Sequence, residues 1–204
     1  MTGQIYRIKI TLEHVEPAVW RRIEVPGDVT LDQLHAIIQR VMGWDDYHMW
    51  SFQVGKTEYQ PETADLFDSG DGPQSRSAEG TTLAQATEGR RISFRYWYDF
   101  GDDWFHALKV ERVADPEPGA IYPRCLEGAR ACPPEDCGGP WGYRNFLDAI
   151  TNPKHPEHEE MLEWIGGEWD AEAFDLDEVN KAIKPRQRKA AKAGRNNTTI
   201  AFSG

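Results

Sequence analysis

The feature that most restricts the fold of this chain is a strict alternation of apolar and polar residues near its N-terminus. In QIYRIKITLE, every second residue from Tyr6 to Leu12 is apolar, whereas Arg7 and Lys9 fall between them. Successive side chains of a β-strand point to opposite faces, so this stretch predicts a half-buried strand. The stretch AVWRRIEV follows a Glu-Pro turn, and we expect it to be the antiparallel partner of that strand.

An amphipathic helix is predicted after this hairpin, over residues 30–43. Thr30 and Gln33 have the spacing of a capping box, in which each side chain accepts a hydrogen bond from the backbone of the other residue. Gly43 is typical of the residue that ends a helix. The apolar residues between these signals recur at helical spacing and form one stripe: Leu31, Leu34, Ile37, Ile38 and Val41.

The rest of the chain predicts further strands first and short helices last. We expect a strand at Met49–Val54, a short helix after Thr82, a hairpin over residues 92–113 and helices over residues 143–150, 156–167 and 175–183. This order predicts an α+β fold. Residues 1–183 should form one compact domain, mostly an antiparallel sheet, with one early helix packed on it and short helices towards the C-terminus. Residues 61–80 are acidic and turn-rich, and they predict a long exposed loop.

Charge is distributed unevenly along the chain. The net charge is −11, but residues 184–204 contain six basic residues and no acidic ones. The remainder therefore carries 17 basic against 34 acidic side chains, and such a body repels nucleic acid. We expect residues 184–204 to be a basic disordered tail and the one part of the chain that could attract DNA.

The composition of the chain also indicates the cellular compartment in which we expect the protein. No stretch approaches the roughly 18 apolar residues that a membrane span requires, so we expect no membrane association. The N-terminus lacks the pattern of a signal peptide. Three cysteines are an odd number, which argues against a disulfide framework. These features together predict a cytoplasmic protein.

The three cysteines, Cys125, Cys132 and Cys137, all lie in the stretch CLEGARACPPEDCGGPWGY. Three thiolates on a tight loop suit a zinc ion, which takes four ligands in a tetrahedron. The fourth ligand would come from elsewhere; our first choice is His106 on the predicted hairpin, and His48 is the second. The stretch is also consistent with reduced, partly buried thiols that bind no metal, or with a reactive thiol, although it contains no Cys-x-x-Cys redox pair.

A second group of polar residues comprises Asp99, Asp102 and His106 on the predicted hairpin, together with His48 in WDDYHMW. Carboxylates and imidazoles at this density could hold a divalent metal or transfer protons, so these four are the candidate catalytic residues. The alternative is that the aspartates make local turn hydrogen bonds and the histidines belong to the core. The eight tryptophans could likewise line a groove for a peptide or a base, or pack in the core.

Several of these stretches occur together in the order found in one known family. They are YRIKITLEHVEPAVWRRIEVP, the helix ending in Gly-Trp, WDDYHMWSF, YDFGDDWFHALKVE and the cysteine stretch. Over residues 4–183 the chain closely resembles the plasmid pRiA4b Orf-three-like family. The resemblance implies a compact α+β domain carried by plasmids, chromosomes and insertion elements as a passenger protein, and it implies no particular activity. Members often read His-Leu-His after the first helix, whereas His48-Met49-Trp50 keeps only the first histidine.

These observations lead to three hypotheses about function. The first, which we favour, is a cytoplasmic, non-enzymatic binding or regulatory module associated with mobile genetic elements, with a protein partner and a cysteine loop braced by zinc or by its own rigidity. The second is a metal-dependent hydrolase or nuclease in which His48, Asp99, Asp102 and His106 converge. The third is a DNA-binding accessory protein that acts through the basic tail. We expect the cysteine stretch to fold back beside the hairpin, so that distant parts of the chain build one centre.

Overall fold

A single mixed sheet organises the computed structural model, which describes residues 3–62 and 75–184. Within these residues the sheet has eight strands in the order β5-β4-β3-β6-β7-β1-β2-β8. Every neighbouring pair is antiparallel except β4 and β5, which run parallel. The predicted α+β class with a mostly antiparallel sheet is therefore confirmed.

The helices and strands have the following bounds. The strands are β1 (Ile5–Leu12), β2 (Trp20–Pro26), β3 (Trp50–Val54), β4 (Thr57–Gln60), β5 (Ser75–Ser77), β6 (Ser93–Tyr98), β7 (Trp104–Ala114) and β8 (Arg124–Ala129). The helices are α1 (Leu31–Met42), α2 (Leu83–Thr87), α3 (Gly139–Thr151), α4 (His158–Ile165) and α5 (Leu176–Ile183). Each predicted helix and strand is present, with shifted ends.

The alternating N-terminal stretch lies in the middle of the sheet as β1, between β2 and β7. Its apolar residues from Tyr6 to Leu12 are buried. The opposite face of the same strand is half-exposed and carries ion pairs, such as the one between Arg7 and Glu24, whose Nη2 and Oε1 atoms are 2.8 Å apart. The alternation therefore separates the core face of the sheet from its charged face.

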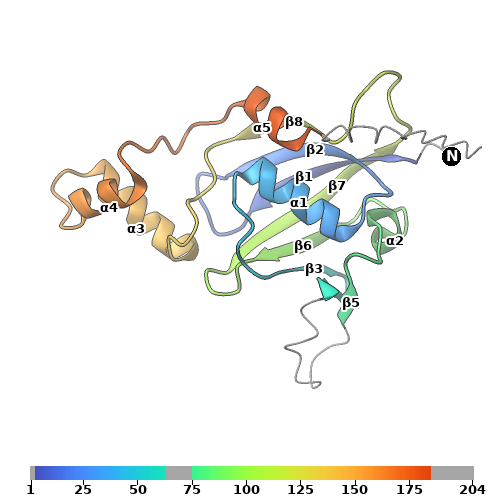
Figure 1. Cartoon of the computed structure of the whole chain (residues 1–204), viewed down its shortest axis with the longest axis horizontal. Helices are drawn as coiled ribbons and strands as arrows, with labels where there is room; N and C mark the ends of the chain where they lie inside the picture. Colours follow the sequence, from blue (N-terminus) through green and yellow to red (C-terminus); the bar gives the residue numbers. More distant parts are fainter. Residues whose placement is uncertain (1–2, 63–74, 185–204) are drawn as a thin grey trace, which may run out of the picture.

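Helix α1 lies across the core face of the sheet (Figure 1). Its start agrees with the sequence signal, because the Gln33 side chain accepts a hydrogen bond from the Thr30 backbone N–H at 3.2 Å. Gly43 follows the helix in the left-handed conformation, as expected for a C-cap glycine. Leu31, Leu34 and Ile38 are fully buried against the sheet.

Two segments that were predicted to be loops contain strands. Ser75–Ser77 forms β5, and Ala78 beside it is fully buried, so the C-terminal part of the predicted loop 61–80 belongs to the body. Cys125 lies on β8, which pairs with β2, and not in a loop. Both strands are short and half-exposed, so they leave too few apolar residues for a visible period. The middle of the predicted loop lies outside the described residues.

The C-terminal helices form two groups (Figure 1). Helices α3 and α4 pack together in a lobe at one end of the molecule, whereas α5 returns to pack on α1 and β8. None of the helices within residues 3–62 and 75–184 is long and apolar enough to cross a membrane. The basic tail predicted for residues 184–204 lies outside the described residues apart from Lys184.

Candidate metal centre

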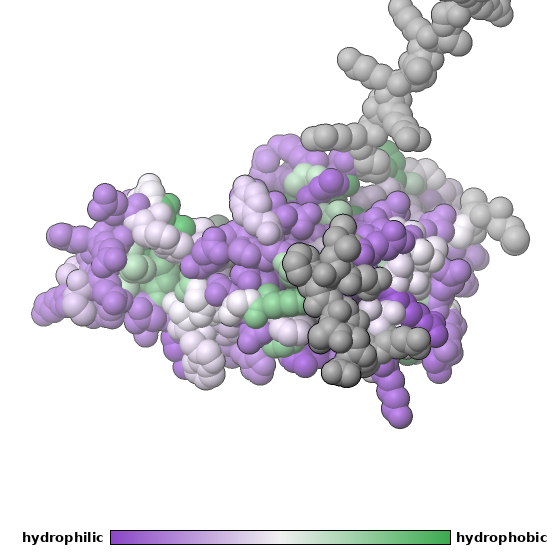
Figure 2. Space-filling view, turned by 60° about the horizontal axis from the view of Figure 1, so that its bottom comes forward, coloured by the Kyte–Doolittle hydropathy of each residue, from purple (hydrophilic) through white to green (hydrophobic). Residues whose placement is uncertain are grey.

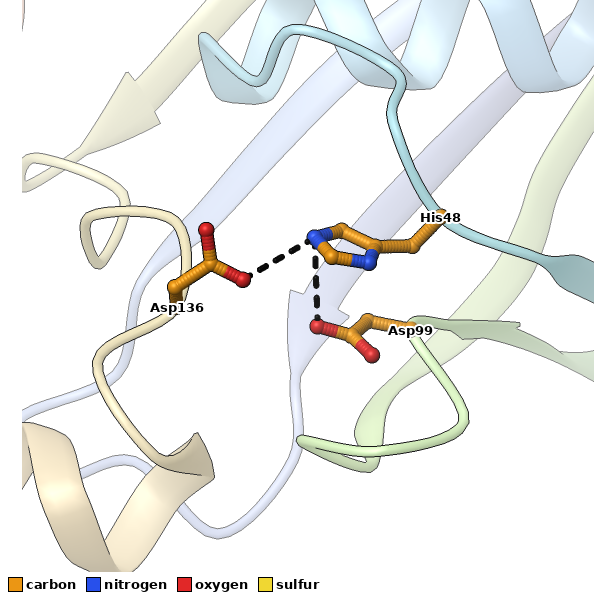
Figure 3. A group of neighbouring side chains, drawn as sticks. All are labelled: His48, Asp99 and Asp136. Atoms are coloured by element: carbon orange, nitrogen blue, oxygen red, sulfur yellow. Dashed lines mark ion pairs between the residues drawn. The ribbon is translucent and has the colours of Figure 1, made fainter.

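Three segments that are far apart in the sequence meet beside the C-terminal end of α1. They are the residues between α1 and β3, the turn between β6 and β7, and the loop between β8 and α3, which we call the cysteine loop (residues 130–138). Figure 3 shows that each contributes one side chain to a common centre: His48, Asp99 and Asp136. One ligand atom from each lies within 4.8 Å of the other two.

Asp99 is held in place by the hairpin turn. Its backbone is in the left-handed conformation, and its N–H donates a hydrogen bond to the Met49 carbonyl at 2.9 Å. Its Oδ1 accepts hydrogen bonds from the backbone N–H groups of Gly101, at 2.9 Å, and Asp102, at 3.3 Å. The other oxygen, Oδ2, remains directed at His48 Nε2, 3.6 Å away.

The acidic pair Glu135-Asp136 is held by contacts of the cysteine loop with the sheet. Glu135 Oε1 accepts hydrogen bonds from the Asp45 N–H at 2.9 Å and the Tyr98 hydroxyl at 3.1 Å. Burial raises the pKa of Glu135, and burial together with the Glu135 charge raises the pKa of Tyr98. Asp136 follows in the left-handed conformation and presents its carboxylate to His48 Nε2, with Oδ1 at 3.2 Å.

The cysteine loop packs tightly against the hairpin turn, as the sequence analysis expected. The Gly138 N–H donates a hydrogen bond to Asp102 Oδ2 at 3.0 Å. The next residue, Gly139, lies so close to the turn that an added Cβ would be 2.2 Å from the Asp102 carbonyl oxygen. On the other side, the Trp44 indole N–H donates to the Pro133 carbonyl at 2.9 Å. The loop is therefore fixed by its backbone on both sides.

His48 occupies the middle of the centre. Its Nε2 is shielded from solvent and has no hydrogen-bond partner among the described residues. It faces three carboxylates, because Glu135 Oε2 lies 3.9 Å away in addition to the oxygens of Asp99 and Asp136. The side chain of Asp99 is buried and that of Asp136 is exposed, so the centre is open to solvent on the side of the cysteine loop.

Among the described residues, the ligand atoms of the predicted zinc site, Cys125, Cys132, Cys137 and His106, do not come together as one group. Within the described part of the chain, the triad His48, Asp99 and Asp136 is the one group whose potential ligand atoms come together. His106 lies in the core, fully buried, where its Nδ1 is 3.1 Å from the Trp104 carbonyl oxygen. Burial lowers its pKa from 6.5 to about 3, so it is neutral. His106 faces inward from its strand, as predicted. Its imidazole therefore lies in the hydrophobic core rather than beside the cysteine thiols.

The three cysteines are free thiols, two buried and one half-buried. Burial raises the pKa of each of them, that of Cys137 to about 12. The charge of Arg21 favours the thiolates of Cys125 and Cys132 but does not offset their burial. Protonated thiols are poor nucleophiles, so these directions favour the interpretation as unreactive, partly buried cysteines over that as a reactive thiol.

The four candidate catalytic residues are only partly brought together. His48 and Asp99 meet, as the hydrolase hypothesis requires. Asp102 uses its carboxylate to hold the cysteine loop, and His106 belongs to the core, so neither reaches the centre. Glu135 and Asp136 were not among the predicted site residues, although both stand in PPEDCGG, because the cysteines are the more conspicuous ligands of that stretch.

A family model for plasmid pRiA4b ORF-3-like proteins matches residues 4–178. The chain belongs to the plasmid pRiA4b ORF-3-like family. The resemblance seen in the sequence is thereby confirmed over nearly its whole extent. Membership of the family supports the fold. The description of the family does not state a reaction.

Two proteins similar to this pRiA4b ORF-3-like chain carry names that assign no function. The uncharacterized protein y4hQ of Sinorhizobium fredii (strain NBRC 101917 / NGR234) is 39% identical over 200 residues, which cover 97% of this chain and 100% of that protein. The crystal structure of MM3350, a protein of unknown function from Methanosarcina mazei Go1, is similar with a TM-score of 0.78 and 32% identity. That likeness covers 88% of this chain and 99% of MM3350. Function must therefore be argued from the site.

Proposed function

We propose that this chain is a non-enzymatic binding module that holds one divalent cation between His48, Asp99 and Asp136. The observation that carries the proposal is the shielded His48 Nε2, which lacks a hydrogen bond within the described residues and faces carboxylates from two other segments. A buried polar atom without a partner costs free energy, and a cation bound there would satisfy it.

The separations of the donor atoms support a first-row metal ion. Two ligand atoms that each bind zinc at about 2.1 Å with a tetrahedral angle lie about 3.4 Å apart. His48 Nε2 lies 3.2 Å from Asp136 Oδ1 and 3.6 Å from Asp99 Oδ2, which bracket that value. Imidazole nitrogen disfavours Mg²⁺ and Ca²⁺, which prefer oxygen ligands, so the donor set suits Zn²⁺ or Mn²⁺.

The cation would connect three segments rather than carry out a reaction. Each ligand comes from a different segment, and the carboxylates of Asp99 and Glu135 already hold backbone groups in place. An ion in this position would join the cysteine loop to the hairpin and stabilise both. The family name refers to a plasmid, and an association with mobile genetic elements and a protein partner remains part of this proposal.

The experiment is calorimetric titration of EDTA-treated protein with Zn²⁺ and with Mn²⁺. We expect one ion per chain. The free energy of unfolding should rise by about 2.7 kcal/mol at a free ion concentration of 100 times Kd. Mn²⁺ is informative because thiols are poor ligands for it. Asp136→Asn should weaken binding by at least about 100-fold, since even residues that only orient a metal ligand contribute up to that factor. Asn also tolerates the left-handed backbone of Asp136, so the fold should persist.

Asp45→Asn is the matched control. Asp45 is exposed on the same side of the molecule and loses the same charge, but it does not belong to the triad. Its substitution should leave Mn²⁺ affinity nearly unchanged. Equal losses in the two variants would mean that the ion responds to general negative charge, and the proposal would then fail. It would also fail if the wild-type chain bound no ion.

A further inference from the structure

Four of the six large apolar side chains that are exposed in the described part of the chain lie in, or just after, the three segments that build the candidate metal centre. Tyr47 and Met49 flank His48, Phe100 follows Asp99, and Trp141 begins α3 shortly after Asp136. Tyr47 and Trp141 are 75% and 77% exposed. Phe100 packs on Trp97, with ring centroids 4.2 Å apart, so Tyr47 and Trp141 are the rings of these segments most available to a partner.

The same segments carry concentrated negative charge. Residues 44–49, 99–103 and 135–141 contain seven acidic residues and no lysine or arginine. We call these three segments the acidic–aromatic face. On the side of the molecule drawn in Figure 2, hydrophilic residues predominate and apolar patches are small. The acidic residues of these segments favour a basic partner, because complementary charges attract.

The acidic–aromatic face is also held in one arrangement. The Asp45 N–H and the Tyr98 hydroxyl both bind Glu135, and the Gly138 N–H binds Asp102, so the three segments are connected by hydrogen bonds. A surface whose backbone is already fixed loses little conformational entropy when a partner binds.

We propose that the acidic–aromatic face docks a segment of a protein partner that is rich in arginine and lysine. Guanidinium and ammonium groups pair with carboxylates, and arginine also stacks on aromatic rings such as Trp141 and Tyr47. Arginine fits best because its side chain makes both kinds of contact. This inference does not depend on the cation, since two ligands neutralised by a metal would leave most of the acidic residues of the face available.

The chain has a basic segment of its own, residues 184–204, and the described chain ends on the side of α5 away from the face. Lys184 lies beside Ile121 and Arg124 in a shallow surface pocket at the C-terminal end of α5. The opposite end of α5 borders a groove that includes Gly43, the residue before the acidic–aromatic face. The chain therefore leaves α5 from the end that is farther from the face.

The test uses a short fluorescein-labelled peptide of alternating arginine and glycine, and fluorescence anisotropy of the full chain in EDTA. We expect saturable binding that weakens as salt is raised. Trp141→Ala should weaken binding by about tenfold, as expected for an aromatic residue at the centre of an interface. The double variant Asp45→Asn, Asp103→Asn should have a similar effect. EDTA makes the result independent of the cation, so this proposal and the metal proposal can fail separately.

Two controls match these variants outside the face. Trp164→Ala removes another exposed tryptophan, on α4, and the double variant Glu159→Gln, Glu160→Gln removes two acidic residues from the same helix. Neither should change peptide binding. If the control variants weaken peptide binding equally, the loss reflects overall charge, and the proposal is overturned. Tighter binding after removal of residues 184–204 would assign the face to the chain's own basic segment and would also overturn it.

Discussion

His48 and His106 belong to one aromatic cluster but have different surroundings. His48 meets Tyr98 edge-on, Tyr98 stacks on Trp44, and Trp44 meets His106 edge-on. One side of His48 faces carboxylates, whereas His106 is enclosed by rings and is fully buried. The two residues are of the same type, so their different surroundings explain their different properties. The imidazole of His48 can meet a cation, whereas that of His106 stays neutral.

We expect the free energy of unfolding to fall as the pH is lowered from 7 to 5, by about 2 kcal/mol from His106 alone. The pKa of His106 is lowered from 6.5 to about 3 in the folded protein because its charged form is desolvated. Below pH 6.5 the unfolded chain therefore binds a proton that the folded protein does not. The contribution of neutral His106 to the free energy of unfolding is complete above pH 6.5. It is lost progressively as the pH falls towards 3. Urea unfolding at both pH values measures it.

Two substitutions separate His106 from the other titrating groups. His106→Gln removes the buried imidazole, so its unfolding free energy should lose about 2 kcal/mol less than that of the wild type between pH 7 and 5. His14→Asn is the control: it changes an exposed histidine in a left-handed backbone position that Asn tolerates, and it measures the effect of removing a histidine outside the core. An unchanged pH dependence in His106→Gln would contradict the assignment.

At the scale of elements, the cysteine loop owes its position to backbone contacts rather than to its thiols. Pro133 and Gly138 bind Trp44 and Asp102 through main-chain groups, and the glycine at position 139 allows the loop to approach the hairpin turn. The result is that the acidic pair of the loop, and not a sulfur atom, faces His48. The Pro- and Gly-rich composition noted in the sequence thus serves close packing of the backbone.

Gly139→Ala should destabilise the protein by about 2–4 kcal/mol, because it combines a left-handed backbone with a clash against the Asp102 carbonyl oxygen. Gly166→Ala is the matched control. Gly166 is also left-handed, but an added Cβ there meets no atom within 4 Å, so only the backbone cost of about 1 kcal/mol applies. Denaturant unfolding measures both losses. If they are equal, the close approach at Gly139 contributes nothing to stability.

At the scale of the whole molecule, α5 completes the domain. Ile183 is buried, and the Asn180 side chain binds both the N–H and the carbonyl of Cys125 on β8, at 2.8 and 3.0 Å. Helix α5 also packs on α1, so the last helix of the described chain covers parts of the first helix and of the edge strand. The boundary after residue 183 stays a prediction, because residues 185–204 lie outside the described part of the chain.

Two truncations test that boundary. Removal of residues 184–204 should shift Tm by no more than about 2 °C, because no core residue of the described body is lost. Removal of residues 176–204 also deletes α5 and exposes the surface under Ile183, which should cost about 3 kcal/mol or more. Thermal unfolding followed by circular dichroism compares the two. A large loss of stability in the first truncation would show that the domain extends beyond residue 183.

The local signals in this chain predicted local structure well. The alternation from Tyr6 to Leu12, the cap at Thr30 and the turn after Tyr98 each depend on residues a few positions apart, and each is present in the fold. The short strands β4, β5 and β8 were missed because neighbouring strands, rather than their own composition, make them strands. Two residues of the candidate site, His48 and Asp99, were identified from the sequence. Glu135 and Asp136 were not.

The order of residues is enough to predict which stretches become strands and helices, and which carry carboxylates, imidazoles and thiols, because local patterns depend on near neighbours. Which of these groups meet depends on the packing of the folded chain. The orientation of the cysteine loop rests on hydrogen bonds from Gly138 to Asp102, 36 residues away, and from Trp44 to Pro133, 89 residues away. Contacts at such separations follow from strand order and packing, and no local pattern encodes that they bring Asp136 to His48 and leave Cys137 aside.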